Sequence, residues 1–369
     1  SKVGRYFYIG KEVLMNRIVY ADNAATTRLS DKAFKEMIPF LRDKYGNPSS
    51  VYNFAQKSKM AIEDAREIIA DSIGAAKSNE IYFTGGGSES DNWALKSAAF
   101  GLRDKGNHII TTKIEHHAIL NTCAYLEKNG FEITYLDVDS EGFVSLEDVK
   151  NAITDKTILI SVMFANNEIG TIEPVCEIGE IAHKHGILFH TDAVQAMCHV
   201  PINVTEMNID LLSASAHKFH GPKGTGAFYC RRGIALNSLI DGGAQERGKR
   251  AGTENVAGIV GLGTAIRIAN EEMEETTKRV SAMRDRLIDG ILEKIPQCRL
   301  NGPRENRLPG NCNISFLGIE GESLLLRLDL AGIAASSGSA CASSSLDPSH
   351  VLLAIGLPHE VAHGSVRLS

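Results

Sequence analysis

The sequence of 369 residues lacks a long apolar run, a block of basic residues and a closely spaced cysteine pair. No apolar run approaches the ~20 residues that a helix needs to cross a bilayer, so we expect no membrane partner. Aspartate and glutamate (45) outnumber lysine and arginine (39), and no basic stretch alternates with aromatic residues. Nucleic acid is therefore not expected as a partner either.

The cysteines are few and scattered. There are seven, without any C-x-x-C pair: Cys123, Cys176, Cys198, Cys230, Cys298, Cys312 and Cys341. An odd, unpatterned set is typical of a reducing compartment, so we expect a cytoplasmic protein with neither a disulfide framework nor a metal site. The first fifteen residues have mixed charges and no apolar core, which argues against a signal peptide; Met15 is a candidate natural start preceded by an extension.

Short apolar runs alternate with helical patterns along most of the chain. Residues 54–74 fit a helix that ends at Gly74 and has one apolar stripe, formed by Ile62, Ala65, Ile68, Ile69 and Ile73. Strand-like runs lie at 81–87, 108–114, 131–138, 157–165, 186–192, 209–215 and 224–230. This alternation predicts an α/β fold, with a mostly parallel sheet covered by helices on both faces.

The pattern changes after about Thr253. Residues 256–295 predict a nearly continuous helix, and a helix of that length usually leaves one domain and enters another. Shorter runs at 313–319 and 331–341 predict a smaller α+β domain. We therefore expect a large domain over residues 28–270 and a small domain formed by residues 1–27 and 271–369.

Four polar clusters follow four predicted strands: FTGGGSES, FANNEIG, HTDAVQ and SASAHKFHG. Ligands of open α/β sheets bind beyond the carboxyl ends of the strands, so these clusters predict one site. Three glycines before a helical pattern, Gly85 to Gly87, favour a phosphate cradle, although a plain glycine turn explains this stretch equally well. Asp192 is either the partner of a cationic ring nitrogen or the cap of the helix that follows it.

Lys218 follows Ser215 and His217 where a buried strand ends and a glycine-rich loop begins. A lysine beside a phosphate cradle and a buried carboxylate is suited to form a Schiff base with an aldehyde cofactor. Burial and a neighbouring cation would lower its pKa below the usual value of ~10.4. Pyridoxal 5′-phosphate needs this combination of lysine, phosphate cradle and carboxylate.

Cys341 lies in a stretch of small residues, AGIAASSGSACASSSLDPSH, which predicts an exposed loop. A cysteine on such a loop is suited to be a nucleophile that reaches a site, accepts a group there and carries this group to an acceptor. An incidental cysteine in a linker is equally consistent with the composition of this stretch.

Taken together, the motifs of the chain resemble those of the cysteine desulfurases of the IscS/NifS type, from about Ile18 to Ser369. The stretches that carry the resemblance are YADNAATT, GNPSSVY, IEHHAIL, ANNEIGTIEP, HTDAVQA, SAHKFHGPKGTG, GGAQERGKRAGTENV and SSGSACASSSLDPSHVL. The resemblance implies a pyridoxal-phosphate enzyme of the class-V aminotransferase type on the aspartate aminotransferase fold (fold type I). It also implies a homodimer that converts L-cysteine to L-alanine.

The resemblance assigns roles to matching positions. Lys218 would form the Schiff base, His116 would stack on the pyridine ring and assist proton transfers, and Asp192 would keep the ring nitrogen protonated. Gln195 would bond the phenolic oxygen. Phosphate would be held by Gly87, Ser88, Ser215 and His217, together with Thr253 from a second subunit. Asn167 would contact both cofactor and substrate, and Arg367 would grip the substrate carboxylate.

Cys341 would take the sulfur as a persulfide and pass it to a scaffold or carrier protein, for iron–sulfur clusters or thiolation. The chain ends SVRLS, where relatives continue with a further helix and a docking tail, so we expect a shortened small domain and altered docking of the scaffold. Two alternatives are a selenocysteine or cysteine-conjugate lyase on the same fold and an inactive paralogue that serves as a scaffold.

Overall fold

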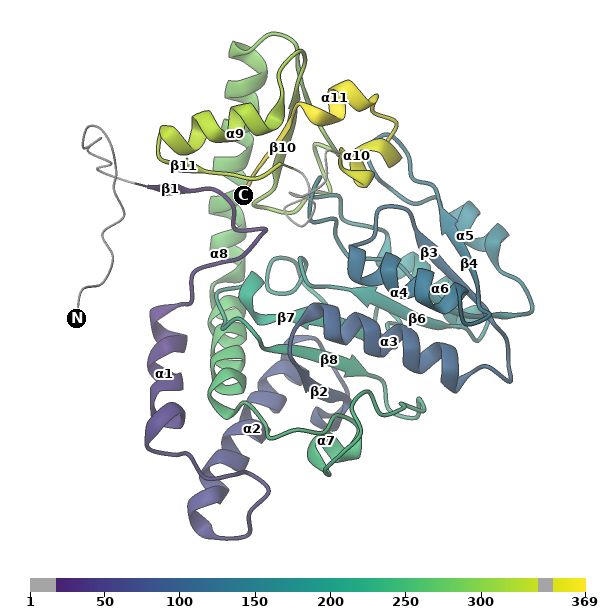
Figure 1. Ribbon diagram of the computed structural model, residues 1–369, viewed down its shortest axis with the longest axis vertical. Helices are drawn as coiled ribbons and strands as arrows, with labels where there is room; N and C mark the ends of the chain where they lie inside the picture. Colours follow the sequence, from purple (N-terminus) through teal and green to yellow (C-terminus); the bar gives the residue numbers. More distant parts are fainter. Residues whose placement is uncertain (1–17, 338–347) are drawn as a thin grey trace, which may run out of the picture.

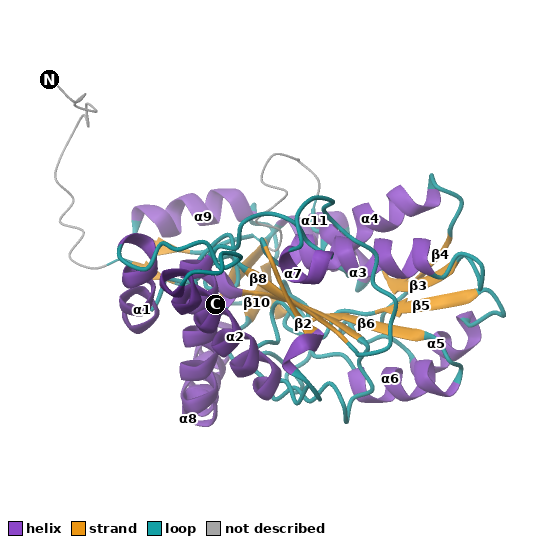
Figure 2. Ribbon diagram, turned by 90° about the horizontal axis from the view of Figure 1, so that it is seen from below, coloured by secondary structure: helices purple, strands orange, loops and turns teal. Residues whose placement is uncertain are grey.

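The computed structural model describes residues 18–337 and 348–369, and a seven-stranded sheet forms its centre (Figures 1 and 2). The strands lie in the order β2 (Ile81–Thr84), β8 (Gly226–Cys230), β7 (Leu211–Ser215), β6 (Leu188–Asp192), β5 (Thr157–Ser161), β3 (His108–Thr112) and β4 (Glu132–Leu136). Strand β8 runs antiparallel to both of its neighbours, and the other pairs are parallel. The predicted α/β fold is confirmed, although each of these strands is shorter than the apolar run that predicted it.

Helices cover both faces of this sheet (Figure 2). Helices α3 (Gly87–Gly101) and α4 (His117–Glu127) lie on one face, and α5 (Leu146–Ala152) and α6 (Val175–Lys184) lie on the other. Neighbouring strand residues pack into different apolar clusters: Ile109 and Leu211 face α3, whereas Ile110 and Leu212 join the cluster that includes α6. This alternation is what a strand buried on both faces requires.

Three helices pack beside the sheet: α1 (Asp31–Arg42), α2 (Asn53–Ser72) and α8 (Val256–Lys294). Helix α2 bears the predicted apolar stripe, and Gly74 follows its end with φ of +64°. Helix α8 matches the predicted long helix. Its buried residues lie mostly between Ala257 and Ile266, beside α1 and α2, and Ile288 is buried near its other end.

The far end of α8 meets a smaller sheet of β9 (Cys298–Leu300), β10 (Cys312–Phe316) and β12 (Ser365–Leu368), in the antiparallel order β12-β10-β9. Strand β1 (Val19–Tyr20) pairs with β11 (Ile333–Ala334), and α9 (Gly321–Leu330), α10 (His350–Ala354) and α11 (His359–His363) complete this part. The division into domains 28–270 and 1–27 plus 271–369 stays a prediction. Within the described ranges, no helix combines the length and apolarity needed to span a membrane.

Candidate active site

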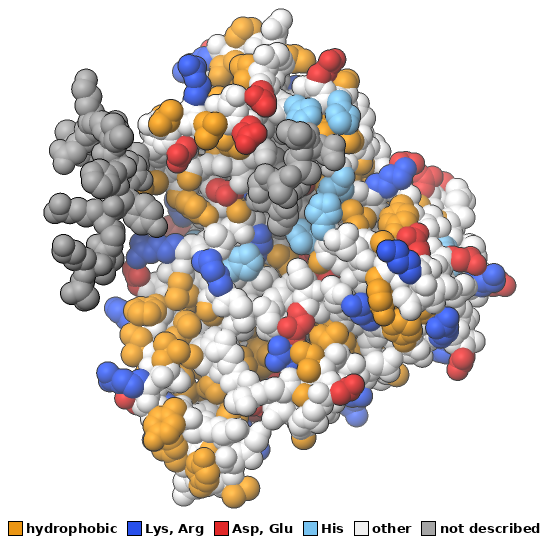
Figure 3. Space-filling model, in the orientation of Figure 1, with side chains coloured by type: hydrophobic (Ala, Val, Ile, Leu, Met, Phe, Trp, Pro, Cys, Tyr) orange, Lys and Arg blue, Asp and Glu red, His pale blue; other side chains and the backbone are white. Residues whose placement is uncertain are grey.

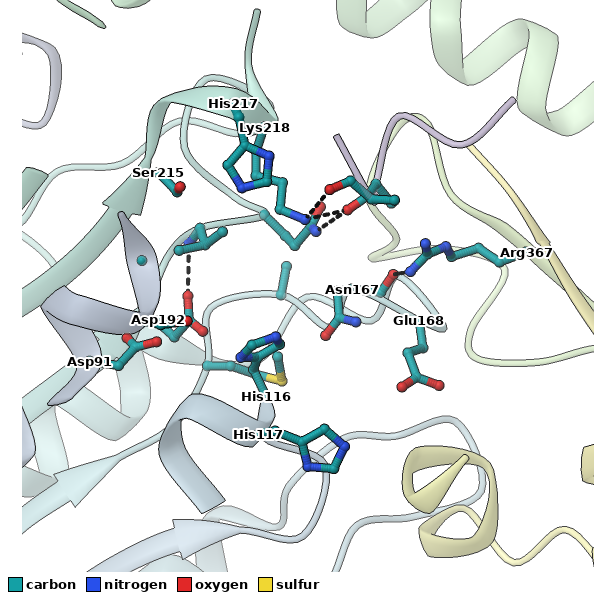
Figure 4. A pocket seen from close by; sticks show the side chains of 18 of the residues that line it. Asp91, His116, His117, Asn167, Glu168, Asp192, Ser215, His217, Lys218 and Arg367 are labelled. Atoms are coloured by element: carbon teal, nitrogen blue, oxygen red, sulfur yellow. Dashed lines mark hydrogen bonds between the residues drawn. The ribbon is translucent and has the colours of Figure 1, made fainter. Parts of the chain in front are cut away.

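A cavity of about 290 Å³ lies at the carboxyl ends of the central strands (Figure 4). All four polar clusters contribute to it. The predicted site residues that line it are Gly87, Ser88, His116, Asn167, Asp192, Gln195, Ser215, His217, Lys218 and Arg367. Apart from Arg367, which belongs to the smaller sheet, their positions follow from the topology, because parallel strands bring their carboxyl ends to one edge of the sheet.

Two predicted site residues are not part of this wall. Thr253 is exposed and does not line the cavity; the prediction places it in the site of a second subunit. Cys341 lies outside the described residues. The predicted roles of both residues stay predictions.

The glycine stretch after β2 forms a cradle at the start of α3. Gly86 has φ of +150°, a conformation that residues with a side chain rarely adopt, and α3 begins at Gly87. A Cβ atom on Gly87 would lie 2.5 Å from Cγ2 of Val194, so only glycine fits. Ser215 also borders this cradle. The free N–H groups of a helix start beside a hydroxyl suit a phosphate group.

Lys218 closes the short 3₁₀ helix Ala216–Lys218 that follows β7. Its Nζ donates hydrogen bonds to the carbonyl oxygens of Ala24, at 2.6 Å, and Ala25, at 3.0 Å. Gln195 Nε2 donates to the same Ala24 oxygen at 2.9 Å. The segment 21–25 thus holds the lysine amine and the glutamine amide side by side at the cavity wall.

That segment is itself fixed by contacts with Ser369. The backbone N–H of Asn23 donates to the carbonyl oxygen of Ser369, and the backbone N–H of Ala24 donates to its Oγ at 2.8 Å. Ser369 N–H in turn donates to the carbonyl oxygen of Ala21 at 2.9 Å. The acceptors of the lysine amine therefore depend on residues from opposite ends of the described chain.

Asp192 ends β6 and is buried, with 5% of its surface exposed. Its Oδ1 accepts a hydrogen bond from Val194 N–H at 2.9 Å, so it caps the turn after the strand. It also faces the cavity. The segment after it is a turn rather than the expected helix, and the role of Asp192 toward a ring nitrogen stays a prediction. Burial raises the pKa of Asp192, and the nearby His116 and Lys218 act in the opposite direction.

His116 is the N-cap of α4, and its ring lines the cavity near Asp192 (Figure 4). Its Nδ1 accepts a hydrogen bond from Ala118 N–H at 3.1 Å. This bond assigns the neutral proton to Nε2. Burial lowers the pKa of His116, which favours the neutral ring. The side chain is therefore suited to exchange a proton at Nε2.

Sequence reasoning missed several residues of this wall, among them His350, Glu168 and Asp91. The rings of His117 and His350 lie 4.7 Å apart between centroids, and His350 Nε2 donates to the carbonyl oxygen of Glu115 at 2.9 Å. Glu168 accepts a hydrogen bond from Ser349 Oγ. Glu168 lies within the motif ANNEIGTIEP and His350 within SSGSACASSSLDPSHVL, and Asp91 directly follows FTGGGSES, but no local pattern gave any of the three a role.

Arg367 of β12 brings a buried guanidinium to the opposite wall, with 2% of its surface exposed. Its Nη1 donates to the carbonyl oxygen of Asn167 and its Nη2 to Asp22 Oδ1, both at 3.0 Å. Within residues 18–337 and 348–369, its Nε has no hydrogen-bond partner. A planar donor at the cavity wall is suited to a carboxylate ligand.

Comparisons with known proteins agree with this geometry. The family described as aminotransferase class-V matches residues 19–369. A cysteine desulfurase IscS of Clostridium botulinum is 63% identical over 357 residues, covering 96% of this chain and 90% of the relative. A solved NifS-like protein is 41% identical with a TM-score of 0.90, covering 96% of this chain and 93% of its own. A structure described as SspA in complex with cysteine is 39% identical with a TM-score of 0.84, covering 95% and 98%.

Proposed function

Because the chain belongs to the class-V aminotransferase family, and within it to the cysteine desulfurases, we propose that this cavity holds pyridoxal 5′-phosphate and L-cysteine. The products are L-alanine and a persulfide on Cys341. One observation carries the proposal: Lys218, Asp192 and the glycine cradle of α3 line a single cavity.

The residues present fit this cofactor. The cradle at Gly87 excludes even a methyl group yet borders open space, and the N–H groups of α3 and the hydroxyl of Ser215 suit a phosphate. Asp192 supplies a buried carboxylate for a protonated pyridine nitrogen, and Gln195 supplies an amide for the phenolic oxygen. His217 lines the same corner as the cradle and completes the phosphate site.

When bound, pyridoxal phosphate supplies an electron sink for the bonds around the substrate Cα. The chain supplies the groups that direct this chemistry. Asp192 holds the proton on the ring nitrogen, and the Lys218 amine binds the cofactor and exchanges protons with the substrate carbon. His116 moves protons at Nε2, and Arg367 with Asn167 orients the substrate carboxylate.

The sulfur-transfer step needs no reactant other than L-cysteine and the Cys341 thiolate. The Cys341 thiolate attacks the substrate sulfur, so an S–S bond forms as the Cβ–S bond breaks, and protons from the site convert the remaining carbon skeleton to alanine. Residues on both sides of the undescribed segment support this role. Ser336 exchanges backbone hydrogen bonds with Arg367, and His350 lines the cavity.

A homodimer in a reducing compartment belongs to the proposal. An exposed apolar surface covers α1, the start of α2 and the segment between them (Figure 3). Its residues are Phe34, Ile38, Leu41, Tyr45, Val51, Tyr52, Phe54 and Met60. Apolar patches of this kind mark interaction sites, so we place the second copy, which would supply Thr253, on this surface. A scaffold or carrier protein would then accept the sulfur in the cytoplasm.

Alanine release from L-cysteine tests the function. The assay contains pyridoxal phosphate and a thiol reductant, and compares the native chain with Cys341→Ala and with Cys176→Ala. Cys176 is an exposed cysteine on α6, so its variant controls for the loss of any accessible thiol. We expect alanine from the native chain and from Cys176→Ala, and a loss of at least a hundredfold in Cys341→Ala.

Other outcomes separate the alternatives. Equal alanine release from all three proteins would contradict the persulfide step and favour a lyase that needs no cysteine nucleophile. Absence of alanine from the native chain, despite the visible absorbance of bound cofactor, would contradict the desulfurase function itself.

A further inference from the structure

A second buried carboxyl group lies beside Asp192. Asp91 of α3 has 1% of its surface exposed and lines the same cavity. Figure 4 shows its carboxyl group facing that of Asp192. In the part of the chain that the structure describes, Oδ1 of Asp91 has no hydrogen-bond partner. The proposed function uses only one of these two acids, so the other needs an explanation.

The groups around Asp91 provide little to stabilise a negative charge. The side chain of Ser213 lowers the pKa of Asp91 but does not outweigh its burial, and His190 Nε2 lies 3.8 Å from its Oδ1. His190 is completely buried and bonds Ser161 Oγ at 2.9 Å and Ser213 Oγ at 3.1 Å. Burial lowers the pKa of His190 to about 3, so this ring is neutral. Glu115, from the turn before α4, is a further acid and raises the pKa of Asp91.

Asp192 has better partners. It accepts the Val194 N–H, and it lies close to His116 and Lys218, which favour its charged form. Two neighbouring carboxyl groups in a dry site do not both ionise readily, so the proton is retained by the one with fewer partners. Burial and the charge of Asp192 accordingly raise the pKa of Asp91 well above its usual range.

We propose that Asp91 is a positioning residue that keeps its proton and holds the Asp192 carboxylate in place toward the cavity. The proposal rests on the proposed function in one respect, since the group that meets Asp192 is the pyridine ring of pyridoxal phosphate. A neutral acid behind Asp192 excludes water from this carboxylate without adding a second charge. The ring nitrogen therefore meets one fixed negative charge.

Infrared spectroscopy of the full-length chain tests the protonation state without relying on the cofactor. Aspartate is labelled with ¹³C at its side-chain carboxyl group, and spectra are recorded at neutral pH with and without added pyridoxal phosphate. We expect a carbonyl band of a protonated aspartic acid, which Asp91→Asn removes. The matched control is Asp64→Asn, at an exposed position of α2, which should leave the band intact. A band that survives in Asp91→Asn, or its absence from the native chain, would overturn the proposal.

The absorbance of bound pyridoxal phosphate against pH tests the positioning role. Asparagine has the shape and neutrality of a protonated aspartate, so Asp91→Asn should keep the midpoint of the titration within about 0.3 pH units and the cofactor affinity within about threefold. Asp91→Ala leaves room for water beside Asp192, and we expect its cofactor affinity to fall at least tenfold.

Two results would overturn this role. If Asp91→Asn moves the midpoint by about one pH unit or more, Asp91 carries a charge in the native protein. If Asp91→Ala binds the cofactor as the native chain does, Asp91 does not position Asp192. A native chain that develops no visible band on addition of pyridoxal phosphate would instead refute the proposed function, while the infrared result still decides the protonation of Asp91.

Discussion

The buried ion pair between Arg66 and Glu246 can be tested by mutation. The guanidinium donates to the two carboxylate oxygens at 2.9 and 2.8 Å, and both side chains are at most 4% exposed. Glu246 also accepts the Phe83 N–H of β2 at 3.0 Å. Glu246→Gln would leave the buried Arg66 charge with only the half-exposed Glu63, 3.3 Å from its Nε, as a counter-ion. Losing the buried partner should cost about 3 kcal/mol of unfolding free energy.

Urea unfolding at fixed protein concentration measures this loss. The chain has one tryptophan, Trp93, and its side chain is buried. The centroid of its ring lies 5.3 Å from that of Tyr82 in β2, so its fluorescence reports on the region of the ion pair. The control is Asp289→Asn, which breaks an exposed pair with Arg304 and should cost about 1 kcal/mol at most.

A double-mutant cycle separates the pair from its surroundings. Arg66→Met combined with Glu246→Gln leaves no buried charge, so the double variant should be more stable than the sum of the single losses implies, by at least about 1 kcal/mol. The reasoning is refuted if Glu246→Gln costs no more than Asp289→Asn, or if the two single losses simply add.

Three further variants test other parts of the structure. Burial raises the pKa of Glu173 from 4.5 to about 8, so between these values the folded chain keeps a proton that the unfolded chain releases, and stability falls as pH rises. We therefore expect the unfolding free energy of the native chain, measured by urea unfolding, to fall relative to that of Glu173→Gln by up to about 1.4 kcal/mol per pH unit between about pH 5 and 8. If the unfolding free energies of the two proteins change in parallel with pH, the reasoning is contradicted. Gly87→Ala should weaken pyridoxal phosphate binding at least tenfold, measured by absorbance titration, because its Cβ would meet Val194, whereas Gly290→Ala, with open space around it, should not. Arg367→Lys should raise the KM for L-cysteine at least tenfold in steady-state assays with cofactor affinity retained, and a KM equal to that of the native chain would count against carboxylate binding there.

Local patterns predicted the elements well but not their ends. The 3.6-residue spacing identified α2 and nearly the full length of α8, because helix periodicity accumulates over many residues. The strands were placed correctly but drawn too long. The run 157–165 ends as a strand at Ser161, since its later residues turn toward the cavity. The antiparallel direction of β8 has no counterpart in the apolar pattern of its sequence.

The site residues that follow the end of a strand of the central sheet could be predicted from the sequence. The ends of β6 and β7 placed Asp192 and Lys218 together from topology alone. His350 and Asp91 were missed because their partners are far away in sequence: His350 bonds Glu115, 235 residues away. Only the folded chain shows that the carboxyl group of Asp91 on α3 faces that of Asp192.

The hydrogen bonds between segment 21–25 and Ser369 make the site one of the last parts of the molecule to form. The lysine amine closes a loop of 194 residues on Ala24, and Ala24 itself is tied to Ser369 across 345 residues. Contacts of such separation are slow to form, and during synthesis they must wait until Ser369 has left the ribosome. A nascent chain can assemble its central sheet earlier, but it completes the lysine pocket only after Ser369 has emerged.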